Sequence, residues 1–242
     1  MIARLLWLLC LLACATAGAQ TRVLDDFGNL SNWHAEHTDD VVATLANTPG
    51  HDGPAMRLQF DFAGVNGYAT ARRKLPLDLP DNFEFSFWIR GEAGVNNLQF
   101  KLVDDSGENV WWINRPDFAF SREWQQIRIK KRQIEFAWGP TKDRTLKHIA
   151  SIEFVVSTGR DGGKGSVDFD QLELRALPAP DANPPKPVIT ASSVHANSSP
   201  DAVMDGDLNT YWGSKAATGS TAIGSIRARP RGWRNSSGDF IV

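Results

Sequence analysis

Cysteine is almost absent from the sequence, and its two cysteines are placed where they cannot stabilise a folded domain. Cys10 and Cys14 are the only ones in 242 residues. Both lie within residues 1–19, where a charged start, an apolar run over 5–15 and a small-residue exit are typical of a secretory signal peptide. Removal of this segment takes both thiols away, which excludes disulfide and thiol chemistry from the mature chain.

A long apolar run is missing as well. The run over 5–15 is too short to cross a hydrocarbon core of about 30 Å as a helix, and no later stretch approaches the roughly 20 apolar residues needed. We therefore expect no membrane span and an exported protein, either periplasmic or extracellular. Leu11-Leu12-Ala13-Cys14 allows an alternative, a lipoprotein site that leaves a lipidated Cys14 at the new N-terminus, although the bulky Leu12 disfavours it.

Neither sign of charge is in excess. The sequence has 26 Lys and Arg residues against 28 Asp and Glu residues, which gives a formal net charge of -2. Because the chain is nearly neutral and no basic stripe stands out, nucleic acid is not an expected partner. The short basic run 130–132 lies inside an alternating strand pattern, and we interpret it as a solvated face.

Catalytic motifs are missing too. Glycoside hydrolysis normally needs two carboxylates opposed across the scissile bond, and no strand pattern carries alternating glutamates of the kind that sandwich-fold glucanases use. His34 and His37 have no third ligand at zinc-like spacing. We therefore expect a binding protein rather than an enzyme, and no organic cofactor.

Alternation of apolar and polar residues, in contrast, recurs between residues 23 and 174. It is clearest in 56–62, 83–90 and 98–102, and further strands are expected at 109–113, 126–130, 149–156 and 166–174. Period two is the signature of strands with one buried face, and the sequence 104–107 predicts a hairpin turn. We predict an all-β fold over residues 20–177, an antiparallel jelly-roll β-sandwich.

A proline-rich segment follows this domain. Residues 177–187 contain five prolines and no periodic apolar residues, so 178–187 is expected to be an extended linker. After it, residues 188–217 begin a second, incomplete β module. The Arg-rich remainder, 218–242, lacks alternation, and we expect it to be a disordered or frame-shifted tail.

Three features of the first domain resemble the galactose-binding-like jelly rolls of carbohydrate-binding modules. They are Asp25-Asp26-Phe27 at its start, Trp124 ahead of a strand, and 167–174 at its end. The resemblance implies that the first and last strands lie together and that a structural calcium is held there by Asp26 and by Asp168 or Asp170. Alternatively, these aspartates are turn and edge positions that deter strand aggregation; both interpretations stay open.

The second module resembles the start of a discoidin domain, also called the coagulation factor 5/8 type C domain. The resemblance rests on Ala191-Ser192-Ser193 and on the run 200–212, which contains Asp-Gly-Asp and ends in Tyr-Trp. It implies a calcium site at Asp207 and Thr210. The acidic residue that the family supplies near the domain end is missing here, so we expect this site not to function.

Nine tryptophans exceed what a core of this size needs, so some are expected to face a ligand. Sugars bind by stacking on aromatic rings and by hydrogen bonds to polar groups. The alternation in 83–90 and 98–102 turns four such side chains outward. They are Trp88, Arg90, Gln99 and Lys101. If the two strands are neighbours in one sheet, these side chains form one patch with Trp88 at its centre.

Other residues could extend this patch. The candidates are Tyr68, Arg72, one of the pair Trp111 and Trp112, and Trp138 at the rim. Adjacent residues in a strand face opposite ways, and the phase does not decide which of Trp111 and Trp112 is exposed. Trp33 and Trp124, near strand starts, are expected in the core.

The sequence therefore predicts non-catalytic binding of a polysaccharide or oligosaccharide by the accessory region of a larger glycoside-active enzyme. Two alternatives remain. In one, the exposed tryptophans dock the sandwich onto the catalytic domain of its own parent chain. In the other, the scaffold is a polysaccharide lyase or hydrolase, with Arg72, Lys101 or Tyr68 as catalytic groups.

Overall fold

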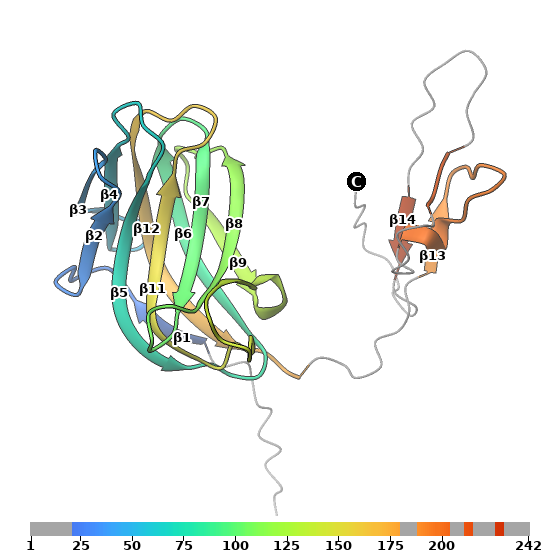
Figure 1. Ribbon diagram of the computed structural model, residues 1–242, viewed down its shortest axis with the longest axis horizontal. Coiled ribbons are helices and arrows are strands. Elements are labelled where there is room, and N and C mark those ends of the chain that lie inside the picture. Colours follow the sequence, from blue (N-terminus) through green and yellow to red (C-terminus); the bar gives the residue numbers. More distant parts are fainter. Residues whose placement is uncertain (1–20, 180–187, 204–210, 215–225, 230–242) are drawn as a thin grey trace, which may run out of the picture. The chain divides into compact units, whose positions relative to one another are not determined.

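The computed structural model describes residues 21–179, 188–203, 211–214 and 226–229. The chain divides into two compact units, within 1–180 and 181–242. In the first unit, two antiparallel sheets lie face to face (Figure 1). Among the described residues of this unit, the helical structure is one 3-10 turn, η1 (Lys131–Gln133). The predicted all-β sandwich is confirmed. The expected signal peptide and most of the expected linker lie outside the described residues.

One sheet, here called sheet A, has the strand order β3-β4-β12-β6-β9, with β1 also paired to β12. Its strands are β1 (Thr21–Asp25), β3 (Val42–Pro49), β4 (Pro54–Asp61), β6 (Phe83–Glu92), β9 (Gln125–Lys130) and β12 (Lys164–Ala176). The pairing of β1 with β12 confirms that the first and last strands of the domain lie together.

The other sheet, sheet B, has the order β10-β8-β7-β11-β5-β2. Its strands are β2 (Trp33–His37), β5 (Tyr68–Asp78), β7 (Asn96–Val103), β8 (Val110–Phe118), β10 (Glu135–Trp138) and β11 (His148–Ser157). The predicted hairpin is β7-β8. The expectation that 83–90 and 98–102 are neighbours is wrong, because residues 93–95 carry the chain from β6 in sheet A to β7 in sheet B.

The core lies between the sheets and is centred on aromatic rings. The Phe154 ring lies 4.3 Å from that of Phe169 across the two sheets and also contacts Phe87 at 4.9 Å. Trp33 is buried among these rings, as expected. Trp124 is only half-buried and lies on the outer side of sheet A, so its assignment to the core is wrong.

The described part of the second unit is small. It consists of β13 (Val188–Ala191) paired with β14 (Ile226–Arg229), the turn η2 (Pro200–Val203), and a short stretch in which the Trp212 indole donates to the carbonyl of Ser193. β14 lies within 218–242, where a disordered or frame-shifted tail is expected, and that expectation stays a prediction. Asp207 and Thr210 lie outside the described residues. In the part of the chain that the structure describes, no helix has the length and apolar character of a membrane span.

Candidate binding surface on sheet B

The outer face of sheet B carries a row of aromatic and charged side chains. Leu98, Phe100 and Leu102 of β7 face the core, so the alternating residues face outward. The strand register then aligns side chains from β8, β7, β11 and β5 across the sheet. In this order they are Trp112, Lys101, Glu153 and Arg72, and we call them the sheet B row.

The register also shows which of the adjacent residues Trp111 and Trp112 faces outward. Trp111 turns inward, is buried, and donates its indole N–H to the carbonyl of Arg144 at 2.8 Å. Trp112 faces outward and is half-buried, and its ring meets that of Trp138 at 5.4 Å in a T-shaped contact. Gly139 follows at φ +137°, where a Cβ would collide with Asn109, so the chain can turn sharply after Trp138. Trp138 is 46% exposed on the edge strand β10, and its position at the rim of a ligand surface stays a prediction.

Lys101 lies at the centre of this surface between two aromatic rings. Its Nζ is 5.2 Å from the ring centroid of Trp138 and 5.7 Å from that of Tyr68. Burial lowers the pKa of Lys101, and the neighbouring Glu153 opposes this shift. Lys101 is half-buried, and within the described part of the chain no carboxylate oxygen lies within 4 Å of its ammonium group.

The remaining polar groups of the surface are held by one another. Arg72 lies 3.6 Å from the Glu36 carboxylate and 3.5 Å from that of Glu153. Burial raises the pKa of Glu153, against the opposing charges of Lys101 and Arg72. Gln99 donates to the hydroxyl of Ser157 at 3.4 Å. Tethering of this kind limits rotamer freedom and reduces the entropy lost when a ligand binds.

Glu153 was missed by the sequence reasoning, although a signal for it exists. It is the one charged residue in the expected strand 149–156. A charged side chain within a mostly apolar strand needs either solvent or a partner of opposite charge, because such residues are rarely buried unpaired, and this could have marked Glu153 as a candidate.

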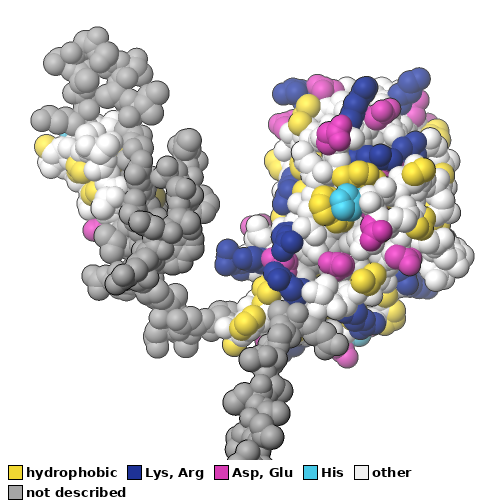
Figure 2. Space-filling view, turned by 180° about the vertical axis from the view of Figure 1, so that it is seen from behind, with side chains coloured by type: hydrophobic (Ala, Val, Ile, Leu, Met, Phe, Trp, Pro, Cys, Tyr) yellow, Lys and Arg dark blue, Asp and Glu magenta, His cyan; other side chains and the backbone are white. Residues whose placement is uncertain are grey.

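Trp88 and Arg90 do not belong to this surface. Both project from β6 on the outer face of sheet A, on the other side of the sandwich from Lys101. The Trp88 ring is covered by the imidazole of His51, with the ring centroids 3.7 Å apart and the planes 11° apart. Figure 2 shows this side of the unit, with one histidine side chain among hydrophobic groups and several Lys and Arg groups nearby. The predicted single patch with Trp88 at its centre is therefore wrong.

Solved structures with a similar fold exist, although the sequence matches no protein-family model and no curated protein. The family 11 carbohydrate-binding module of the cellulosomal cellulase Lic26A-Cel5E of Clostridium thermocellum is 19% identical, with a TM-score of 0.54, and the match covers 66% of this chain and 97% of that one. A family 11 module from the same organism, in complex with a β-1,3-1,4-mixed-linked tetrasaccharide, is also 19% identical, with a TM-score of 0.55 and coverage of 66% and 98%. The first unit has the β-sandwich fold of these carbohydrate-binding modules.

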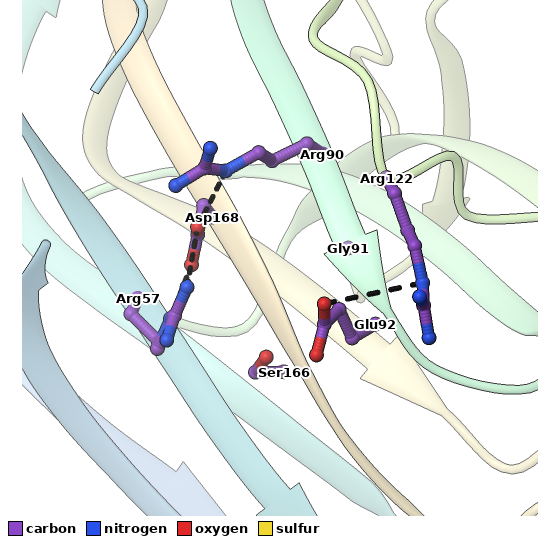
Figure 3. A pocket seen from close by; sticks show the side chains of 7 residues that line it. All are labelled: Arg57, Arg90, Gly91, Glu92, Arg122, Ser166 and Asp168. Atoms are coloured by element: carbon purple, nitrogen blue, oxygen red, sulfur yellow. Dashed lines mark hydrogen bonds and ion pairs between the residues drawn. The ribbon is translucent and has the colours of Figure 1, made fainter. Parts of the chain in front are cut away.

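Within this module fold, Asp168 does not fit a calcium ion. Its carboxylate accepts hydrogen bonds from Arg57 Nε at 2.6 Å and Nη2 at 2.8 Å, and from Arg90 Nε at 2.9 Å (Figure 3). Two guanidinium groups already neutralise this carboxylate and occupy its oxygens. Asp168, on β12, instead joins this strand to β4 and β6 through its bonds to Arg57 and Arg90.

Asp170 fits a calcium ion better. It is fully buried; Oδ2 accepts the backbone N–H groups of His51 and Asp52, whereas Oδ1 has no partner in the described structure. A buried carboxylate oxygen without a partner is costly and is the kind of ligand that calcium uses. Asp26 is exposed, and its Oδ1 accepts the N–H of Gly28. The described residues hold no cluster of three acidic, His or Cys side chains suited to a metal, so a calcium here would also need backbone carbonyl oxygens.

Proposed function

We propose that the first unit is a non-catalytic polysaccharide-binding module whose ligand lies across the outer face of sheet B. The observation that carries this proposal is the sheet B row, with an unpaired ammonium group between the rings of Tyr68 and Trp138. Aromatic faces stack on the apolar faces of pyranose rings, and the neighbouring cations and amides donate to hydroxyl oxygens. The fold shared with carbohydrate-binding modules supports the same function.

The site is an outer sheet face crossed by a row of side chains, which suits a long chain better than an enclosed small molecule. Affinity per site is expected to be modest, because stacking and a few hydrogen bonds must offset the cost of immobilising the sugar. A module of modest affinity is still useful when it is linked to another domain, because the linked domain then meets its substrate at a raised local concentration. We propose that this partner is a glycoside-active enzyme domain.

Affinity electrophoresis of the full chain tests the proposal, in gels that contain mixed-linkage β-glucan, galactan, xylan or polygalacturonate. We expect retarded migration in at least one gel. Migration unaffected in every gel would favour the docking function, in which the aromatic face contacts a catalytic domain. Release of reducing or unsaturated ends would establish an enzyme, with Arg72, Lys101 and Tyr68 as the first residues to replace.

Calcium binding at Asp170 is a further part of the proposal, supported by the unpartnered Oδ1. At a free calcium concentration one hundred times the dissociation constant, binding to the folded state adds about 2.7 kcal/mol, a rise in Tm of roughly 5–10 °C for a domain of this size. Thermal unfolding of the chain in calcium and in EDTA measures this difference in Tm. Asp170→Asn should abolish the calcium response, whereas Asp168→Asn should lower Tm in both buffers and keep the response. Equal Tm values for the unchanged chain in the two buffers would contradict calcium binding.

We further propose that the protein is exported, with residues 1–19 as its signal peptide, and that 188–217 is the beginning of a discoidin-like module. The contact of Trp212 with the Ser193 carbonyl supports the discoidin-like module, because it joins the two ends of the motif that carries the resemblance. N-terminal sequencing of the secreted chain would test the first point. A mature chain that begins at residue 20 is expected, and one that begins with a lipid-modified Cys14 would show a lipoprotein.

A further inference from the structure

A polar pocket lies on the outer face of sheet A, away from the proposed polysaccharide surface. It has a volume of about 180 Å³. The side chains that line it come from β4, β6 and β12 and from the segment before β9 (Figure 3). They are Arg57, Arg90, Glu92, Arg122, Ser166 and Asp168.

Two of the three arginines are fixed in place by a buried acid. The Asp168 side chain is 3% exposed and hydrogen-bonds both Arg57 and Arg90. Each of these guanidinium groups keeps one nitrogen, Nη1, without a hydrogen-bond partner in the described part of the chain. The pocket is therefore lined by two guanidinium groups that Asp168 holds in place, a donor set that suits oxyanions such as carboxylate and sulfate.

The third arginine is held only loosely. Arg122 lies 3.9 Å from Glu92, and the two side chains are 81% and 69% exposed. An exposed ion pair of this length contributes little, so a stronger anion can replace Glu92 as the partner of Arg122. With three guanidinium groups and two carboxylates, the pocket keeps an excess of one positive charge.

Aromatic rings adjoin the pocket on the side of Arg90. The Arg90 guanidinium carbon lies 4.6 Å from the ring centroid of Trp124, and Trp124 lies in turn 6.3 Å from the imidazole of His51. Guanidinium donors beside a half-buried indole suit a ligand that has both an anionic group and a sugar ring. A free inorganic ion would use only the arginines.

We propose that this pocket is a second ligand site, which binds the carboxylate or sulfate group of an acidic sugar. It lies on the opposite sheet from the polysaccharide surface, shares none of its residues, and does not depend on the function proposed for that surface. A single module with both sites would contact two glycan segments at once.

Titration of the full chain with galacturonic acid, galactose-6-sulfate, galactose and sodium sulfate, followed by NMR, tests this inference. We expect both acidic sugars to shift the amide signals of Gly91 and Ser166 and the Nε signal of Arg57, whereas galactose leaves them unchanged. Arg122→Ala should weaken binding of galacturonic acid roughly two- to fivefold, and Glu92→Gln should strengthen it by a similar factor. Both residues are exposed, so neither replacement endangers the fold.

Matched controls keep this test separate from the first proposal. Arg128→Ala removes a cation from the same sheet that does not line the pocket, and it should leave the affinity for galacturonic acid unchanged. Trp112→Ala, on the other sheet, should also leave it unchanged. No shift with either acidic sugar, a response to sulfate ion alone, or changes in the same direction for Arg122→Ala and Glu92→Gln would overturn the inference. If the unchanged chain shows these shifts but is not retarded in any polysaccharide gel, the result would instead count against the sheet B surface.

Discussion

Trp112→Ala is expected to weaken binding of the polysaccharide that the module retains by at least about tenfold. The indole of Trp112 lies in the sheet B row beside Lys101, and its ring also supports the exposed Trp138. Truncation of an aromatic side chain that anchors a ligand costs about 2 kcal/mol or more, and 1.4 kcal/mol corresponds to a factor of ten. Affinity electrophoresis over a range of polysaccharide concentrations gives the dissociation constants to compare.

Trp88→Ala is the matched control for this prediction. It removes the same side chain type from the opposite sheet, where His51 covers the ring. We expect the affinity for polysaccharide to stay within a factor of two of the unchanged chain. A large loss with Trp88→Ala and none with Trp112→Ala would place the ligand on sheet A and would show that the sheet B assignment is wrong.

Phe154→Ala is expected to produce the largest loss of stability. Phe154 is fully buried, and its ring contacts Phe87, Phe100 and Phe169 among others at the centre of the sandwich. Removal of a buried phenylalanine side chain costs about 3–5 kcal/mol through lost burial and the cavity that remains. Because domains are stable by only about 5–15 kcal/mol, the variant should unfold at much lower urea concentration.

The control for this prediction is Val42→Ala, which truncates a side chain that is 58% exposed on β3. We expect it to change the free energy of unfolding by no more than about 0.5 kcal/mol. Should Phe154→Ala unfold at the same urea concentration as Val42→Ala, the central position of Phe154 in the core would be contradicted.

Much of the fold could be predicted because the information is local. Each of the seven expected strands is present, and the inward positions in β6 and β7 follow from the alternation. Strands β2, β3 and the 11-residue β5 lie outside the seven expected ranges and were not predicted. The turn 104–107 was recognised because Asp104 and Gly107 are residues that turns require, and the Asp104 carboxylate accepts from both Ser106 and Asn109 there.

The composition of the site could be predicted only in part, because strand pairing is not local. Alternation showed that Trp88 and Lys101 both face outward, yet it contains no information about which sheet each strand joins. The crossover at 93–95 separated them by the thickness of the sandwich. Trp111 and Trp112 presented the same difficulty, since only the register with β7 shows which one faces the solvent.

The environment of Asp168 could not be predicted for a related reason. As a carboxylate in the last strand it was a plausible calcium ligand, but its environment depends on Arg57 and Arg90, which lie 111 and 78 residues earlier in the chain. Asp170, two residues later, has the unpartnered oxygen that a cation requires. Two aspartates with the same alternation phase therefore have different partners, two guanidinium groups for Asp168 and two backbone N–H groups for Asp170.

The most direct test of the central claim is to follow the indole N–H signals of the nine tryptophans by NMR during titration with an oligosaccharide of the retained polysaccharide. Trp112→Ala, Trp138→Ala, Trp88→Ala and Trp124→Ala variants assign the signals that matter. Binding on sheet B predicts that the signals of Trp112 and Trp138 move with the ligand while those of Trp88 and Trp124 stay in place. Movement confined to Trp88 and Trp124 would contradict the account.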